Sequence, residues 1–93
     1  MALVVCDQVF PGFRDSERMV AIRDIHGKCQ LLRVERDFLT EAAGKNYVTV
    51  GIVHRDPKTE TVLIELPHEA ESGAHRLWVR PEHLRESLET PAA

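Results

Sequence analysis

The sequence predicts an all-β (mostly β) domain: a small five-stranded antiparallel barrel or twisted sheet with at most one short helix. Apolar and polar residues alternate over residues 47–54 and again over 61–66, which is the period of strands that bury one face. The intervening residues 55–60 contain an Asp-Pro pair, which is typical of a turn. Aromatic residues make up only 5% of the chain, so Val, Leu and Ile must build the core, and two of these three are β-branched.

Length and charge limit the domain organisation and the classes of function. A chain of 93 residues is one domain, which we expect to span residues 1–85, with residues 86–93 as a tail that frays. The net charge of −3 disfavours a general nucleic-acid coat protein, which needs basic residues to neutralise phosphate. Residues 1–6 lack the basic start of a signal peptide, and no apolar run reaches the ~20 residues of a membrane span. These observations predict a cytoplasmic protein.

The first third of the chain predicts one strand and one hairpin. Residues 2–6 are a short apolar strand, after which Phe10 and Phe13 are expected to hold the Pro11-Gly12 turn against the core. Residues 19–25 and 28–35 are expected to pair around a tight turn at His26-Gly27. Alternation would let two apolar pairs meet across this hairpin. They are Val20 with Ile22 and Leu32 with Val34.

Residues 35–44 are ambiguous. Phe38, Leu39 and Ala42 have helical spacing, and Gly44 stands where a glycine often ends a helix. A short helix or turn that joins two hairpins is the prediction, and a continued strand is the alternative.

The second hairpin supplies most of the predicted core. Its inward residues would be Val48, Val50, Ile52, Val62, Ile64 and Leu66, joined by Val79 of a third strand over residues 75–80. The solvated face would carry Tyr47, Thr49, Thr61 and Glu65. Gly51 in mid-strand indicates a bulge or a sharp bend.

The end of this segment resembles a known fold family. Residues 77–84, Leu-Trp-Val-Arg-Pro-Glu-His-Leu, give an apolar strand, a proline-led turn and an apolar closing residue. This order resembles SH3-like small β-barrels, in which a single 3₁₀ turn commonly separates the last two strands. The resemblance covers the last third of the chain and concerns the fold alone. The chain lacks the tandem Trp-Trp and the Tyr-rich motif of peptide-binding SH3 domains, and the fold by itself does not choose a function.

Trp78 is the residue that most favours a binding site. On a strand, Arg76, Trp78 and Arg80 share one face, and Leu77 and Val79 share the other. If the two aliphatic residues point inward, the single Trp points outward between two arginines. The alternatives are an arginine that stacks on the indole and shields it, or a reversed register with Trp78 in the core.

The titratable residues do not form a recognisable catalytic or metal motif. The five histidines lack the close ligand spacing of zinc sites, and they are expected on the surface. Cys6 and Cys29 are expected to be reduced and to act as small hydrophobic residues. The pair His26 and Cys29 flanks an exposed turn without an orienting group, so no catalytic residue is predicted.

Three functions of different classes remain as hypotheses, of which a small hydrolase or redox enzyme that uses Cys29 ranks third. The first is a non-catalytic interaction module or small subunit that binds another protein, with no cofactor and no metal. The second is a nucleic-acid-binding SH3-like domain, which the net charge disfavours. Both would use the same predicted binding residues, which are Trp78, Arg76, Arg80, Arg55 and Lys58.

Overall fold

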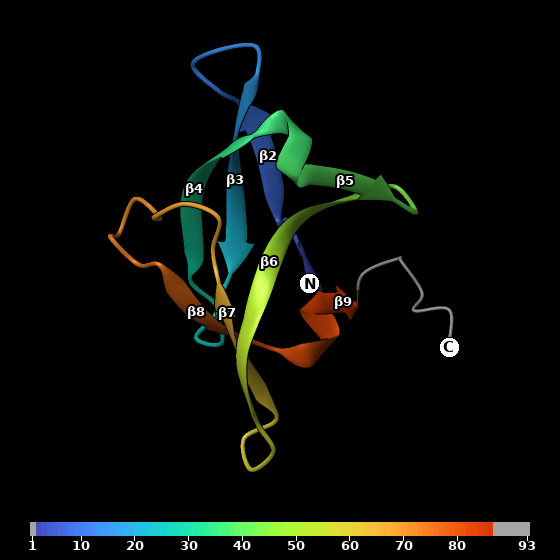
Figure 1. Ribbon diagram of the computed structural model, residues 1–93, viewed down its shortest axis with the longest axis vertical. Coiled ribbons are helices and arrows are strands. Elements are labelled where there is room, and N and C mark those ends of the chain that lie inside the picture. Colours follow the sequence, from blue (N-terminus) through green and yellow to red (C-terminus); the bar gives the residue numbers. More distant parts are fainter. Residues whose placement is uncertain (1, 87–93) are drawn as a thin grey trace.

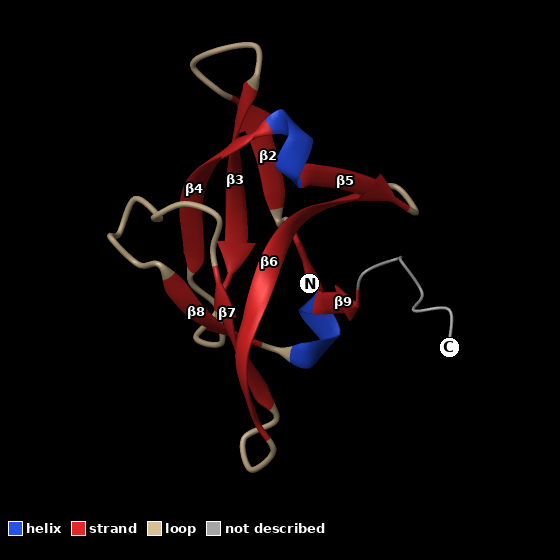
Figure 2. Cartoon of the chain, viewed as in Figure 1, coloured by secondary structure: helices blue, strands red, loops and turns tan. Residues whose placement is uncertain are grey.

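Nine strands and two 3₁₀ turns follow one another in the computed structural model, which describes residues 2–86 (Figures 1 and 2). The strands are β1 (Ala2–Val5), β2 (Gln8–Pro11), β3 (Glu17–Arg23), β4 (Cys29–Glu35), β5 (Leu39–Ala42), β6 (Lys45–Asp56), β7 (Thr61–Glu65), β8 (Arg76–Val79) and β9 (Leu84–Glu86). The 3₁₀ turns are η1 (Arg36–Phe38) and η2 (Pro81–His83). The all-β class is confirmed, with more strands than the five expected.

The strands form two open antiparallel sheets among the described residues. One sheet has the order β8-β7-β6-β1-β9, with β5 paired to the first part of β6, and the other has the order β2-β3-β4. β6 is the long strand that pairs with β5, β1 and β7 in turn, and its hairpin with β7 projects from the body of the molecule (Figure 1).

One hydrophobic core joins the two sheets. Val20 and Leu32, a directly opposed pair of β3 and β4, belong to the same buried cluster as Val48 and Ile64 of the larger sheet. Val20 and Ile22 were expected to meet Leu32 and Val34 across this hairpin. All four are buried in one cluster, but only Val20 and Leu32 are directly opposed. The predicted core residues Val50, Val62, Ile64 and Val79 are buried, and Ile52 packs against the cluster from a partly buried position.

Residues 35–44 do not form the helix that their spacing suggested, but η1 is the predicted turn that joins two hairpins, β3–β4 and β5–β6. η1 is a single turn, and β5 then pairs with β6 through a two-residue connection, Ala43-Gly44. Both residues have positive φ, at 53° and 77°, which is the conformation of a type I′ hairpin turn. Gly44 therefore serves a hairpin rather than a helix end, and the alternative prediction of a strand is correct over Leu39–Ala42.

The irregularity signalled by Gly51 occurs just after it. The register between β6 and β7 shifts between Ile52 and His54, so Val53 is the extra residue of a β-bulge. At the start of β6, Tyr47 is only 7% exposed, although it was predicted on a solvated face. The guanidinium of Arg85 lies over its ring, 5.5 Å from the ring centroid, and helps to cover it.

The prediction that Phe10 and Phe13 hold the first turn against the core is also wrong. Phe10 is exposed and Phe13 is 96% exposed, at the tip of the loop between β2 and β3. A Cβ atom at Gly12 would lie 2.5 Å from the carbonyl oxygen of Glu17, and the Gly12 N–H donates to that oxygen at 3.1 Å. The loop closes on its own backbone, so it does not need the aromatic rings to hold it.

The C-terminal end of the described chain has the expected order of elements. η2 separates β8 from β9, and β9 returns to pair with β1. Strand β9 includes Glu86, which was assigned to the tail, and residues 87–93 of the predicted tail lie outside the described residues.

Candidate functional site

β8 places Trp78 on the outer face of the larger sheet. Leu77 and Val79 are 6% and 0% exposed, so they occupy the inner face, and Trp78 between them is half-buried on the outer face. The parity predicted from the sequence is therefore confirmed. An amphipathic ring in this position offers a large and rigid contact area.

Trp78 ends a row of three side chains that crosses the sheet. The register pairs Leu63 with Trp78 on one side and with His54 on the other, so all three lie on the outer face. The rings of His54 and Trp78 meet edge to face, with centroids 6.2 Å apart and an interplanar angle of 88°. We call His54, Leu63 and Trp78 the Trp78 row.

The bulge at Val53 is the reason that His54 belongs to this row. Ile52 lies opposite Ile64 on the inner face, and without an extra residue His54 would have the same parity as Ile52. The bulge moves His54 opposite Leu63, on the outer face. Sequence reasoning missed His54 and Leu63 as site residues, although Gly51 was a signal that the alternation might break nearby.

The same bulge removes Arg55 from the predicted site. Arg55 lies opposite Val62, which is buried, so it shares the face opposite to that of Trp78. Lys58 lies in the turn between β6 and β7, where its backbone N–H donates to Oδ1 of Asp56 at 3.0 Å. The structure thus does not place these two cations on the face of the Trp78 row.

The other two predicted cations do flank Trp78. Arg76 lies opposite Glu65 and forms an ion pair with it at 3.2 Å, with both side chains about half exposed. Such an exposed pair contributes ~0–1 kcal/mol, so a partner can recruit Arg76 at little cost. Arg80 is exposed and has extended dihedral angles, φ −80° and ψ 143°, so it continues the alternation of β8 on the Trp78 side.

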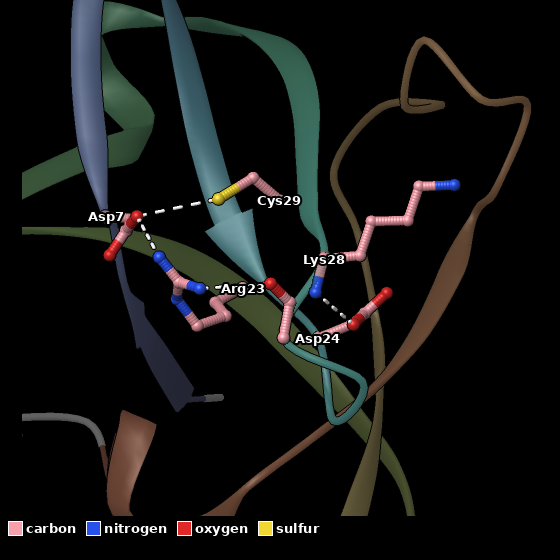
Figure 3. Close-up of polar contacts among 6 residues, drawn as sticks. Asp7, Arg23, Asp24, Lys28 and Cys29 are labelled. Carbon is pink, nitrogen blue, oxygen red and sulfur yellow. Dashed lines mark hydrogen bonds and ion pairs between the residues drawn. The ribbon is translucent and has the colours of Figure 1, made fainter.

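The turn between β3 and β4 supports Trp78 from the neighbouring sheet. The backbone N–H of Ile25 donates to the carbonyl oxygen of Trp78 at 3.0 Å. Oδ1 of Asp24 accepts from the backbone N–H of Lys28 at 3.0 Å (Figure 3). It also accepts from the backbone N–H of His26 at 2.9 Å, and Oδ2 accepts from Gln30. Partial burial raises the pKa of Asp24, but these hydrogen bonds outweigh it and the pKa is lowered.

A second polar contact lies beside this turn. Oδ2 of Asp7 is 2.8 Å from a guanidinium nitrogen of Arg23 and 3.5 Å from Sγ of Cys29 (Figure 3). The hydrogen bond from Arg23, followed by that from Cys29, lowers the pKa of Asp7 below its ordinary value of 3.8. Cys29 was expected to act as a small hydrophobic residue, but it is exposed, so that expectation is wrong.

The described residues contain no group of three or more His, Cys, Asp and Glu side chains placed to hold a metal ion. Within residues 2–86, no helix is long and apolar enough to cross a membrane.

Comparisons with protein-family models, curated proteins and solved structures find no match to this chain.

Proposed function

We propose that this domain is a non-catalytic interaction module that binds another protein through the Trp78 row, with Arg76 and Arg80 at its border. The observation that carries the proposal is the half-buried Trp78, held edge to face by His54 on the outer face of β6, β7 and β8. Trp and Arg are the residues most often found at the energetic centres of protein interfaces. The order β8, η2, β9 supports an SH3-like architecture for the module.

Nucleic acid is a weaker candidate for the same face. Glu65 shares the outer face with Trp78 and neutralises Arg76, and Arg55 and Lys58 lie elsewhere. Among the described residues of this face, Arg80 is the one guanidinium without an ion pair, which is too little positive charge for phosphate binding on a chain with a net charge of −3.

The test compares the native chain with Trp78→Ala as baits in a crosslinking pull-down from the source cells. Phe13→Ala is the matched control, since it removes an exposed aromatic ring from the loop between β2 and β3, which projects away from β8 (Figure 1). We expect a partner that the native chain and Phe13→Ala both retain and that Trp78→Ala loses, with the circular dichroism unchanged. Titration of labelled single-stranded DNA and RNA at low salt should show no binding.

A partner that binds Trp78→Ala as well as the native chain would contradict the site. Saturable nucleic-acid binding that Trp78→Ala abolishes would replace the protein partner with the alternative. Acrylamide quenching of the single Trp checks that Trp78 is partly exposed. A half-buried indole is quenched by acrylamide, and the quenching decreases when a partner covers the ring.

A further inference from the structure

β6 changes its neighbour along one edge, and a hollow lies where this change occurs. Residues 45–48 of β6 pair with β5, and residues 51–56 pair with β7 on the same edge. Within the described chain, Thr49 and Val50 therefore pair with β1 on the opposite edge and with neither of these strands. The hollow has a volume of about 370 Å³ and extends from Phe38 of η1 to Leu66 and Pro67 after β7.

The lining of this hollow is largely apolar. Val50 and Leu66 belong to the buried core, so the hollow reaches from the surface to the core. Phe38 and Val53, which also line it, are 38% and 40% exposed, so two large hydrophobic side chains stand in water beside it. Exposed apolar side chains that are gathered in this way are typical of a surface that binds another molecule.

Gly51 is part of the lining, and the fold itself does not require a glycine there. Its φ lies outside the left-handed region, and the extra residue of the bulge is Val53. An added Cβ atom would lie 3.8 Å from the Cβ atom of Glu65, which is an ordinary van der Waals contact. Glycine weakens the interior of a strand, so a glycine where a side chain would fit indicates a site that another molecule approaches closely.

The hollow adjoins the Trp78 row. The register places Gly51 opposite Glu65 and Glu65 opposite Arg76, so these three residues form the next row on the outer face. Leu63 and Glu65 are neighbours on one face of β7, so the two rows are about 7 Å apart. A partner that covers Trp78 can therefore reach the hollow along the same face.

Arg76 places a positive charge at the end of this second row. Its Nη2 donates to Oε1 of Glu65 at 3.2 Å, which is its one ion pair within residues 2–86. A guanidinium has five N–H donors, so donors remain for a carboxylate of a partner. β7 separates β6 from β8, so Gly51 and Arg76 lie about 10 Å apart, which an extended chain spans with about three residues.

We propose that the hollow at Gly51 receives a bulky apolar side chain of the protein partner, and that Arg76 binds an Asp or Glu about three residues away in the same segment of that partner. This inference rests on the proposed function, because the same partner covers the Trp78 row. It adds the chemistry of the partner, which is an extended segment with one apolar anchor and one acidic anchor.

The first test is a titration of the ¹⁵N-labelled chain with the peptide acetyl-Leu-Gly-Gly-Asp-amide at constant ionic strength. We expect saturable chemical-shift changes at the amides of Gly51, Ile52 and Val53 and at Nε of Arg76. The peptides acetyl-Ala-Gly-Gly-Asp-amide and acetyl-Leu-Gly-Gly-Lys-amide should each bind at least fivefold more weakly, because each lacks one anchor. Equal binding of the three peptides, or the absence of saturable binding, would overturn the proposal.

Gly51→Val fills the hollow from its own strand. Its Cβ atom fits and Val favours strands, so the midpoint of urea unfolding should stay the same or rise. The affinity for acetyl-Leu-Gly-Gly-Asp-amide should fall at least tenfold. Thr61→Val is the matched control, since it places the same side chain on the outer face of β7 beyond Leu63, and it should bind the peptide like the native chain. A lower unfolding midpoint in Gly51→Val would mean that the fold requires the glycine and would overturn the proposal.

The pull-down separates this inference from the proposed function when Gly51→Val is added as a bait. We expect the partner to be lost by both Gly51→Val and Trp78→Ala. A partner that Trp78→Ala loses and Gly51→Val retains would overturn the role of the hollow and leave the proposed function standing, whereas a partner that both variants retain would contradict the proposed function itself. A dimer of the native chain in sedimentation velocity that Gly51→Val abolishes would make a second copy of this chain the occupant, and would overturn the partner proposed here.

Discussion

Ile25 and Trp78 are joined by a backbone hydrogen bond of 3.0 Å between the two sheets. β8 is the terminal strand of the larger sheet, so its outer edge would otherwise be open beside the proposed binding row. The turn that carries Ile25 is held by Asp24, whose carboxylate accepts hydrogen bonds from three donors. A turn between two strands of one sheet thus holds the backbone of Trp78 in the other sheet.

Asp24→Ala should change the surroundings of Trp78 without touching it. The loss of the carboxylate leaves two backbone N–H groups of the turn without their acceptor, at a cost of about 1 kcal/mol. We expect stronger acrylamide quenching of Trp78 and faster hydrogen exchange at Ile25. Asp15→Ala is the control, because Asp15 is a fully exposed carboxylate of another loop and should leave the Trp78 signal unchanged.

Ile64→Ala should destabilise the domain by about 2–5 kcal/mol. Ile64 is fully buried and lies opposite both Ile52 and Leu77, so its truncation opens a cavity in the shared core. Urea unfolding followed by circular dichroism measures the difference in the free energy of unfolding. Leu63→Ala, a change of the same size on the outer face of the same strand, should cost clearly less, and the reverse order would mean that the faces of β7 are exchanged.

The ion pair of Asp7 and Arg23 predicts a specific acid sensitivity. The pKa of Asp7 is lowered in the folded chain, so its stabilising contribution is complete above the ordinary value of 3.8 and is lost as the pH falls through the lower, folded value. Arg23→Gln removes the main cause of the shift, and the pKa of Asp7 should rise toward 3.8. Carboxyl ¹³C NMR of Asp7 measures this directly, and an unchanged midpoint in the variant would refute the assignment.

The two cysteines should differ sharply toward alkylating reagents. Burial raises the pKa of Cys6 to about 12, and a thiol reacts only through its thiolate. Cys29 is exposed, so iodoacetamide near neutral pH should modify Cys29 first and leave Cys6 intact until the chain unfolds. Peptide mass spectrometry over a time course shows the order, and early modification of Cys6 would contradict its burial. Reaction of Cys29 at the rate of an unperturbed thiol would also agree with a non-catalytic domain.

The sequence was sufficient for the features that depend on alternation alone. The β3–β4 and β6–β7 hairpins, the buried Ile64 and the outward parity of Trp78 all follow from a period of two within one strand. No single one of these features needs a residue from a distant segment.

Features that depend on one extra residue or on a distant partner could not be predicted. Gly51 indicates an irregularity, but it does not say that Val53 is the inserted residue, and a shift of one position exchanges His54 and Arg55 between the faces. Tyr47 is covered by Arg85, which is brought there only by the return of β9. A hollow lined by Cys6, Asn46 and His83 is formed by three segments that are far apart in the chain, so spacing within the sequence could not predict it.

The position of β1 between β6 and β9 has a consequence for how the chain is made. β1 leaves the ribosome before the other eight strands described, yet Val4 pairs with Val48 of β6 and with Leu84 of β9, which are synthesised much later. The β3–β4 hairpin can form early from local contacts, whereas the apolar strand β1 must wait with both edges unpaired. The larger sheet is therefore completed only after β9 has been synthesised, and β1 is the segment that a chaperone would need to shield until then.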